Sequence, residues 1–88
     1  MNARRWTIIF RALANINRLK IIRMLSGSRK MNVSEIAVAL EISIKATSNH
    51  LAILKNLSVL SPQGVEGHVF YSINSQMPKD FRKTVNLM

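Results

Sequence analysis

The sequence predicts a mainly α-helical domain with one small β-hairpin, an α+β fold in which four helices precede the hairpin and one follows it. Residues 33–57 place a short apolar helix, a three-residue turn and an amphipathic helix in succession, which is the layout of a helix-turn-helix. Two extended runs around a glycine-bounded turn follow within 59–74, as expected for a hairpin. The chain of 88 residues is short enough to form one domain, 1–88.

The first two helices are predicted from apolar residues that recur at three- and four-residue steps. A helix over 3–14 carries an apolar stripe of Trp6, Ile9, Phe10 and Leu13. A second helix runs from Asn17 to Leu25 with Leu19 and Ile22 inward, and Gly27 marks its end.

Sequence signals also define both helices of the helix-turn-helix. Asn32 and Glu35 have the spacing of a capping box at the start of the first. Its inward stripe is Val33, Ile36, Ala37 and Leu40. Ser43 is the predicted cap of the second helix. The inward residues of that helix are Thr47, His50, Leu51, Leu54 and Leu57.

The opposite face of the second helix is small and polar, comprising Lys45, Ser48, Asn49, Ala52 and Asn56. Such a face fits the major groove of DNA, where Asn can address adenine and Lys can address guanine. A simply solvated face is the alternative for an isolated helix, and the flanking sequence favours the groove.

The C-terminal part of the chain completes the fold. A last helix is predicted near Pro78, within terminal residues 78–88, with a stripe of Phe81, Val85 and Met88. Four helices, a hairpin and a fifth helix make a winged helix. A domain this small buries a modest part of its surface, and both terminal helices carry apolar stripes, so we expect a homodimer.

Composition excludes several function classes. Thirteen Lys and Arg against four Asp and Glu give a net charge of +9, which favours nucleic acid as a partner. The absence of cysteine excludes disulfides, thiolate metal sites and cysteine nucleophiles. Four scattered carboxylates and two separated histidines offer no catalytic set, so we expect no enzyme. The apolar run before Arg11 is too short for a signal peptide or a membrane span, and we expect a cytoplasmic protein.

Four segments resemble the ArsR-type family of small winged-helix repressors. They are residues 12–22 (ALANINRLKII), 34–37 (SEIA) with Leu40, 48–51 (SNHL) with Leu54, and 67–71 (GHVFY). The resemblance covers residues 3–74 and implies a dimer built on the first and last helices, with the fourth helix in the major groove and the hairpin as a wing.

The chain also departs from that family. Glu41 and Ser58 stand where the family often has glycine. Either the backbone there stays left-handed, at a cost on the order of 1 kcal/mol, or the turns are shaped differently. Residues 30–34 (KMNVS) lack the cysteine pair of many members, and Asp80 has no histidine nearby. We therefore expect no metal sensing and no cofactor.

Charge placement singles out a few cations for DNA. Eight of the thirteen basic residues lie in the first 30 positions, and residues 56–78 contain none, so the wing is a poor phosphate clamp. Arg29 and Lys30 precede the helix-turn-helix and are better placed for phosphates. The N-terminal arginines form either a solvated face or a basic arm on DNA. Arg18 is ambiguous, with a structural role as the alternative to DNA.

The two histidines have different expected roles. His50 packs and can donate one phosphate hydrogen bond. His68 either touches a phosphate or caps the hairpin.

These observations predict a sequence-specific regulator of transcription that binds double-stranded DNA, most simply a repressor by occlusion. The alternative is a winged-helix module for protein binding, and RNA binding is disfavoured by few exposed aromatics. The predicted DNA-contacting residues are Ser43, Ile44, Lys45, Ser48, Asn49, His50, Ala52, Lys55, Arg29, Lys30 and His68. The predicted dimer contacts are Trp6, Ile9, Phe10, Leu13, Phe81, Val85 and Met88.

Overall fold

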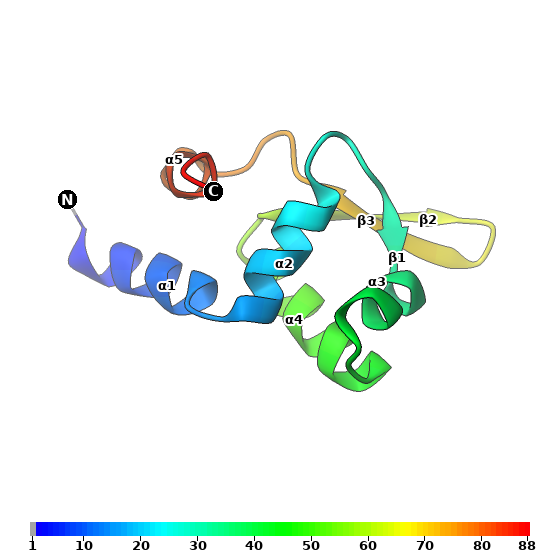
Figure 1. The fold of residues 1–88 in the computed structure, drawn as a ribbon. Coiled ribbons are helices and arrows are strands. Elements are labelled where there is room, and N and C mark those ends of the chain that lie inside the picture. Colours follow the sequence, from blue (N-terminus) through cyan, green and yellow to red (C-terminus); the bar gives the residue numbers. More distant parts are fainter. Residues whose placement is uncertain (1) are drawn as a thin grey trace.

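The computed structural model describes residues 2–88, which form five helices and three strands in the order of a winged helix (Figure 1). The helices are α1 (Ala3–Leu13), α2 (Ile16–Leu25), α3 (Val33–Leu40), α4 (Ile44–Asn56) and α5 (Lys79–Val85). The strands are β1 (Met31–Asn32), β2 (Leu60–Val65) and β3 (His68–Ile73). The predicted helix-turn-helix, hairpin and terminal helices are confirmed.

Short polar side chains begin the first four helices. Asn2, Asn15 and Ser43 each accept a hydrogen bond from a backbone N–H of the first turn that follows. The predicted capping box is present, because Asn32 accepts from the Glu35 N–H and Glu35 accepts from the Asn32 N–H. Local sequence signals therefore set where these helices start.

The sheet contains one strand that the sequence pattern does not indicate. Strand order is β1-β3-β2, all antiparallel, with Met31 opposite Tyr71 and Leu60 opposite Ile73. Pro62 is accommodated because β2 is an edge strand. Two central residues with positive φ, Glu66 at 49° and Gly67 at 81°, close the hairpin, as the right-handed twist of paired strands favours.

The hydrophobic core joins all five helices to the base of the hairpin. Its buried side chains include Ile9, Leu13, Ile21, Ile22, Leu25, Ile36, Leu51, Leu54, Val59, Leu60, Met77 and Phe81. Thr47 is buried with them, and its hydroxyl donates to the Ser43 carbonyl oxygen at 2.9 Å, which satisfies the buried polar group.

The core corrects part of the predicted dimer surface. Phe81 is 0% exposed, and Ile9 and Leu13 are also buried inside one chain. The expectation that these side chains lack cover in a monomer is wrong, because α1 and α5 pack their apolar stripes on the common core. The last helix also ends at Val85, so Met88 lies beyond it.

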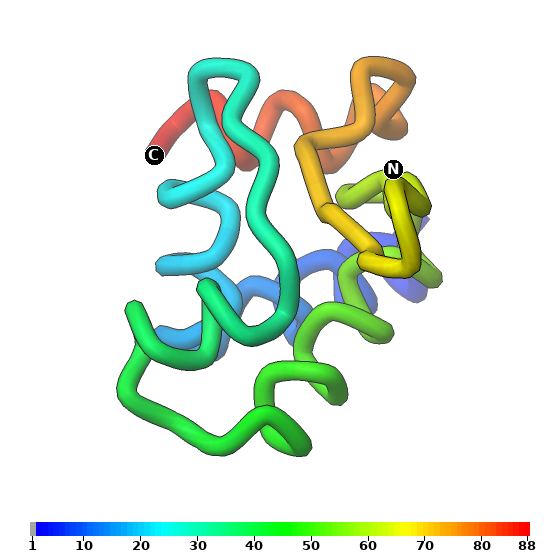
Figure 2. Tube along the Cα trace, turned by 90° about the vertical axis from the view of Figure 1, so that its right-hand side faces the viewer, coloured from blue at the N-terminus to red at the C-terminus, as the bar shows by residue number. Residues whose placement is uncertain are grey.

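The arrangement in space separates two ends of the molecule. α1, α5 and the C-terminus lie at one end, and the hairpin extends at the other (Figure 1). α3 and α4 project on the side opposite α5, as the view turned by 90° also shows (Figure 2). Within residues 2–88, no helix combines the length and apolar character needed to cross a membrane.

Candidate nucleic-acid interface

Helix α4 presents a polar outer face on a firmly packed inner face. Lys45, Ser48, Asn49, Ala52 and Asn56 are all exposed, as predicted. Thr47, Leu51 and Leu54 are buried on the other side. A rigid helix whose outer side chains are short can approach base edges closely, which is the arrangement that reads a major groove.

The turn before α4 sets its direction. Glu41 ends α3 with φ 58° and ψ 41°, and its N–H bonds the carbonyl oxygens of Ala37 and Val38. Of the two backbone shapes that the sequence leaves open, the left-handed one is observed here and also at Ser58, whose φ is 63°. Both positions keep a left-handed backbone that glycine would adopt with less strain.

The first turn of α4 also exposes an apolar side chain. Ile44 opens the helix and is 54% exposed, beside the cap residue Ser43. An apolar side chain at the start of a recognition helix is suited to contact with a thymine methyl group. Ser43 uses its hydroxyl to accept from the Ala46 N–H at 3.0 Å.

Arg18 links α4 to the junction of α1 and α2. Its Nε donates to the Ala12 carbonyl oxygen at 2.6 Å, and its guanidinium Nη1 lies 3.3 Å from Nδ1 of His50. Burial, and then the charge of Arg18, hold the pKa of His50 below its ordinary value. The hydrogen bonds of Arg18 thus join α1 to α4, which favours the structural role over a contact with DNA.

The wing is tied to the start of α3. β1 pairs with β3, and Lys30 Nζ donates to Gln63 Oε1 at 2.8 Å, so a cation from outside the hairpin lies against it. His68 is exposed at the start of β3, edge-on to Phe70 with ring centroids 6.5 Å apart. A hollow of about 540 Å³ separates His68 from Ser34 of α3 and Ser48 of α4.

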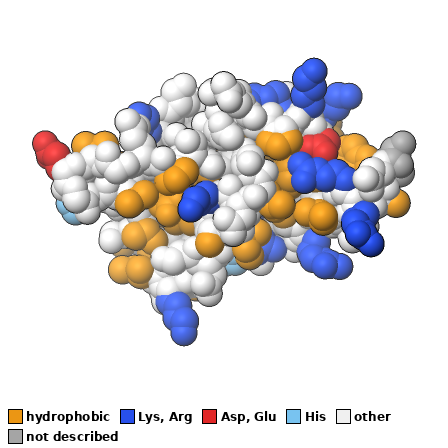
Figure 3. Space-filling view, turned by 180° about the vertical axis from the view of Figure 1, so that it is seen from behind, with side chains coloured by type: hydrophobic (Ala, Val, Ile, Leu, Met, Phe, Trp, Pro, Cys, Tyr) orange, Lys and Arg blue, Asp and Glu red, His pale blue; other side chains and the backbone are white. Residues whose placement is uncertain are grey.

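Basic side chains are spread unevenly over the surface. In the view from behind, Lys and Arg gather at the end that carries α1 and α5 (Figure 3). Near the helix-turn-helix, Arg29, Lys45 and Lys55 are exposed. The hairpin itself contributes no Lys or Arg, as the sequence indicates.

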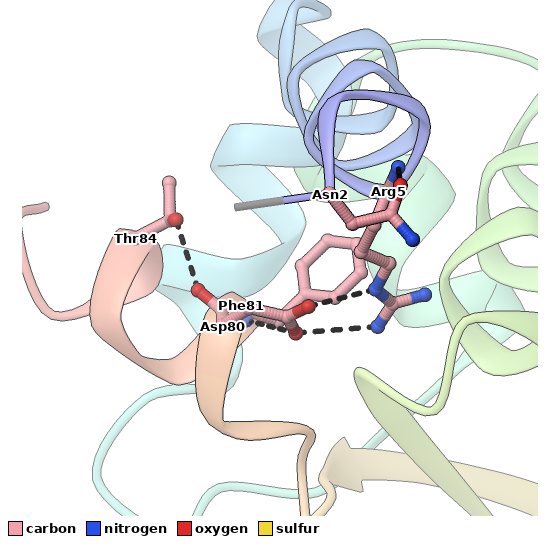
Figure 4. Close-up of polar contacts among 5 residues, drawn as sticks. All are labelled: Asn2, Arg5, Asp80, Phe81 and Thr84. Atoms are coloured by element: carbon pink, nitrogen blue, oxygen red, sulfur yellow. Dashed lines mark hydrogen bonds and ion pairs between the residues drawn. The ribbon is translucent and has the colours of Figure 1, made fainter.

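An ion pair at the α1–α5 end accounts for one N-terminal arginine. Arg5 Nε donates to Asp80 Oδ2 at 2.7 Å, and its guanidinium carbon lies 5.3 Å from the centre of the Phe81 ring (Figure 4). Arg5 therefore belongs to neither of the two predicted alternatives, because it joins α1 to α5. Arg4 and Arg11 have exposed side chains.

Four of the predicted dimer residues stay accessible, two on α1 and two near the C-terminus. Phe10 is 58% exposed, and Trp6 is half-buried with its ring centroid 5.6 Å from that of Phe10. Val85 is half-buried and Met88 is exposed.

In residues 2–88, the His, Asp and Glu side chains form no group of three that could hold a metal ion.

Comparison with known proteins assigns the fold to a family. A family model described as bacterial regulatory protein, arsR family, matches residues 15–61. The chain belongs to the arsR family. The resemblance seen in the sequence is thereby confirmed, and this arsR-family chain is a transcriptional regulator with a winged helix-turn-helix DNA-binding domain.

The relatives of this arsR-family chain include a repressor and an activator of transcription. It is 33% identical over 72 residues to the transcriptional repressor SdpR of Bacillus subtilis (strain 168), covering 82% of this chain and 79% of that protein. It is 32% identical over 74 residues to the transcriptional activator HlyU of Vibrio cholerae, covering 84% of this chain and 68% of that protein.

Solved structures agree with the fold. Reduced HlyU from Vibrio cholerae superposes with a TM-score of 0.80 at 29% identity, covering 98% of this chain and 86% of that one. A homodimeric winged helix-turn-helix DNA-binding domain from Mycobacterium bovis superposes with a TM-score of 0.75 at 25% identity, covering 92% of this chain and 71% of that one.

Proposed function

We propose that this chain is a homodimeric repressor that binds a specific DNA sequence, occludes it and needs no metal to do so. The observation that carries the proposal is the outer face of α4. Lys45, Ser48 and Asn49 are exposed there with hydrogen-bonding groups, while the buried face of the same helix is fixed in the core. These side chains are proposed to contact base edges.

The other predicted contacts fall into two groups. Ser43, Ile44, His50 and Ala52 lie on or beside the same helix and are proposed to line its approach to the groove. Arg29, Lys30, Lys55 and His68 are proposed to contact phosphates, which position the protein on the duplex without reading its sequence.

Support for a dimer comes from α1. An aromatic pair, Trp6 and Phe10, leaves Phe10 more than half exposed on a helix whose buried face, Ile9, Ala12 and Leu13, packs on the core. A pair of aromatic side chains at the surface is a common anchor of a protein interface. The Mycobacterium bovis neighbour is described as homodimeric.

The direction of regulation and the absence of a metal are separate parts of the proposal. SdpR is described as a repressor and HlyU as an activator, so a promoter-reporter assay has to distinguish them. The chain has no cysteine, and its one carboxylate on α5, Asp80, is engaged by Arg5. We propose a role without catalysis in the cytoplasm, where a bacterial regulator meets the chromosome.

Selection of bound duplexes from a random pool tests the function. We expect a consensus sequence, and Asn49→Ala should weaken binding to it by roughly 1–3 kcal/mol while binding to unrelated duplex changes little. Asn56→Ala is the matched control, because Asn56 is exposed at the end of the same helix. Equal losses on both DNAs would assign Asn49 to the backbone, and no duplex binding at low salt would favour the protein-binding alternative.

A further inference from the structure

Arg18 connects three helices through one side chain. Besides the Ala12 contact, its Nη2 donates to the Arg11 carbonyl oxygen at 3.3 Å, so the guanidinium satisfies carbonyls of the last turn of α1. Those carbonyls have no partner within their own helix. The remaining arm, Nη1, reaches 3.3 Å to His50 on α4.

The contact with His50 determines which form of the imidazole is present. A guanidinium has donors and no acceptor, so Nδ1 of His50 must accept, and the ring proton lies on Nε2. Protonation of His50 would place N–H at Nδ1 and would face a second positive charge toward Arg18. The contact therefore exists only with a neutral His50.

We propose that Arg18 is a positioning residue for DNA recognition, holding neutral His50 so that helix α4 keeps its orientation relative to α1. The inference rests on the proposed function, because α1 carries the proposed dimer contact and α4 the proposed base contacts. In a dimer, the orientation of α4 relative to α1 sets the spacing of the two recognition helices, which must match the spacing of the half-sites. Loss of the contact therefore weakens specific binding more than non-specific binding.

Within residues 2–88, no carboxylate forms a hydrogen bond or ion pair with His50. The charged side chains on α4 and on the elements around it are Arg18, Lys20 and Arg23 of α2, Arg4, Arg5 and Arg11 of α1, Glu35 of α3, Glu41 after α3, and Lys45 and Lys55 of α4 itself. Glu35 is engaged in the capping box, and β2 carries no charged side chain. Arg18 supplies the charge that acts on His50.

A direct phosphate contact by His50 would have the opposite dependence on pH. An imidazolium binds phosphate better than a neutral imidazole does, so acidification would strengthen binding if His50 served mainly as a phosphate ligand. The positioning role predicts that acidification weakens specific binding. The sign of the change distinguishes the two.

The experiment measures affinity for the selected duplex and for unrelated duplex at pH 7.5 and 5.0, at constant salt. A His68→Gln background leaves His50 as the titrating imidazole. We expect specific affinity to fall severalfold on acidification, by less than the roughly 30-fold loss that an imidazole of ordinary pKa would allow, with unrelated duplex unchanged or bound more tightly. His50→Asn, whose Oδ1 takes the place of Nδ1 and accepts from Arg18 at any pH, should show less than a twofold difference in specific affinity between the two pH values. Arg18→Gln should show the weakened affinity already at pH 7.5.

Imidazole nitrogen chemical shifts in the protein without DNA provide the second measurement. We expect the Nε2–H form of His50 at neutral pH, and a higher titration midpoint in Arg18→Gln than in the original chain. An Nδ1–H form, or specific affinity that rises on acidification, would overturn the inference. Absence of any duplex binding at pH 7.5 would instead overturn the proposed function, and the chemical shifts would still decide whether Arg18 holds His50.

Discussion

Arg5 of α1 and Asp80 of α5 form a two-pronged ion pair, although 75 positions separate them in the sequence. Nε and Nη2 of the guanidinium donate to the two carboxylate oxygens at 2.7 and 3.2 Å (Figure 4). The hydrogen bonds from Arg5 hold the pKa of Asp80 below its usual value of 3.8. The ion pair joins α1 to α5, and the Arg5 guanidinium lies over the Phe81 ring.

This pair should make stability sensitive to acid. Because the folded pKa of Asp80 is below the unfolded one, its contribution is present above about pH 4 and is lost as pH falls through the folded value. Asp80→Asn should lower the free energy of unfolding by up to about 1 kcal/mol at pH 7 and by less at pH 3, measured by urea unfolding. Arg5→Gln should behave alike and exposed Arg4→Gln should have little effect. Equal effects of the two arginine changes would contradict a specific role for Arg5.

Two of the three aromatic residues expected at the dimer interface, Phe10 and Phe81, should respond differently to an added charge. Phe10→Asp should give a folded monomer, because the side chain is exposed in one chain. Phe81→Asp should prevent folding, because it buries a carboxylate in the core. Light scattering and circular dichroism separate the outcomes.

Ile8→Asp is the control for the dimer experiment, since Ile8 lies about 200° around α1 from Phe10. It should remain dimeric. An original chain that is already monomeric at tens of micromolar would contradict the proposed dimer.

Salt dependence tests where phosphates are bound. If Arg29, Lys30 and Lys55 of each protomer bind phosphates and the charge of Lys45 in the groove also displaces a counterion, a dimer displaces about eight counterions, and log K falls against log salt with a slope near −7. Removing Arg29 and Lys30 together should flatten the slope by about 3 to 4, whereas changing Glu66 and His68 should alter it by less than about 1. If changing Glu66 and His68 altered the slope more than removing Arg29 and Lys30 did, the phosphate contacts would belong to the wing.

Two left-handed positions offer a way to stabilise the protein. Glu41→Gly and Ser58→Gly should each raise the free energy of unfolding by several tenths to about 1 kcal/mol, because glycine adopts positive φ without a clash of its side chain. Ser34→Gly, inside α3, is the matched control and should be destabilising. Thermal or urea unfolding measures all three, and a loss at Ser58 would show that its side chain contributes more than its strain costs.

Features encoded within a few residues could be predicted from the sequence. The capping box of Asn32 and Glu35, the Ser43 cap and the alternation of buried and exposed positions on α4 are local, and the structure confirms them. Features that depend on distant partners could not. β1 consists of two residues and exists because Met31 meets Tyr71 of β3.

The same limit explains the errors at the ends of the chain. An apolar stripe predicts that Phe81 is covered but not by what, so a partner chain and the protomer's own core were equally consistent with the pattern. The contacts of Arg5 with Asp80 and of Arg18 with His50 likewise join distant positions, for which a single sequence holds no signal. The proposed DNA-contacting residues stay predictions.

Asn32 belongs to two structures at once, since it is the last residue of β1 and the cap of α3. A fragment that starts at Val33 would lose both the cap and the pairing with Phe70. Transferring α3 and α4 to another protein would therefore also require the hairpin and the two residues of β1. A graft restricted to the two helices would lack the α3 cap and the pairing that fixes its position.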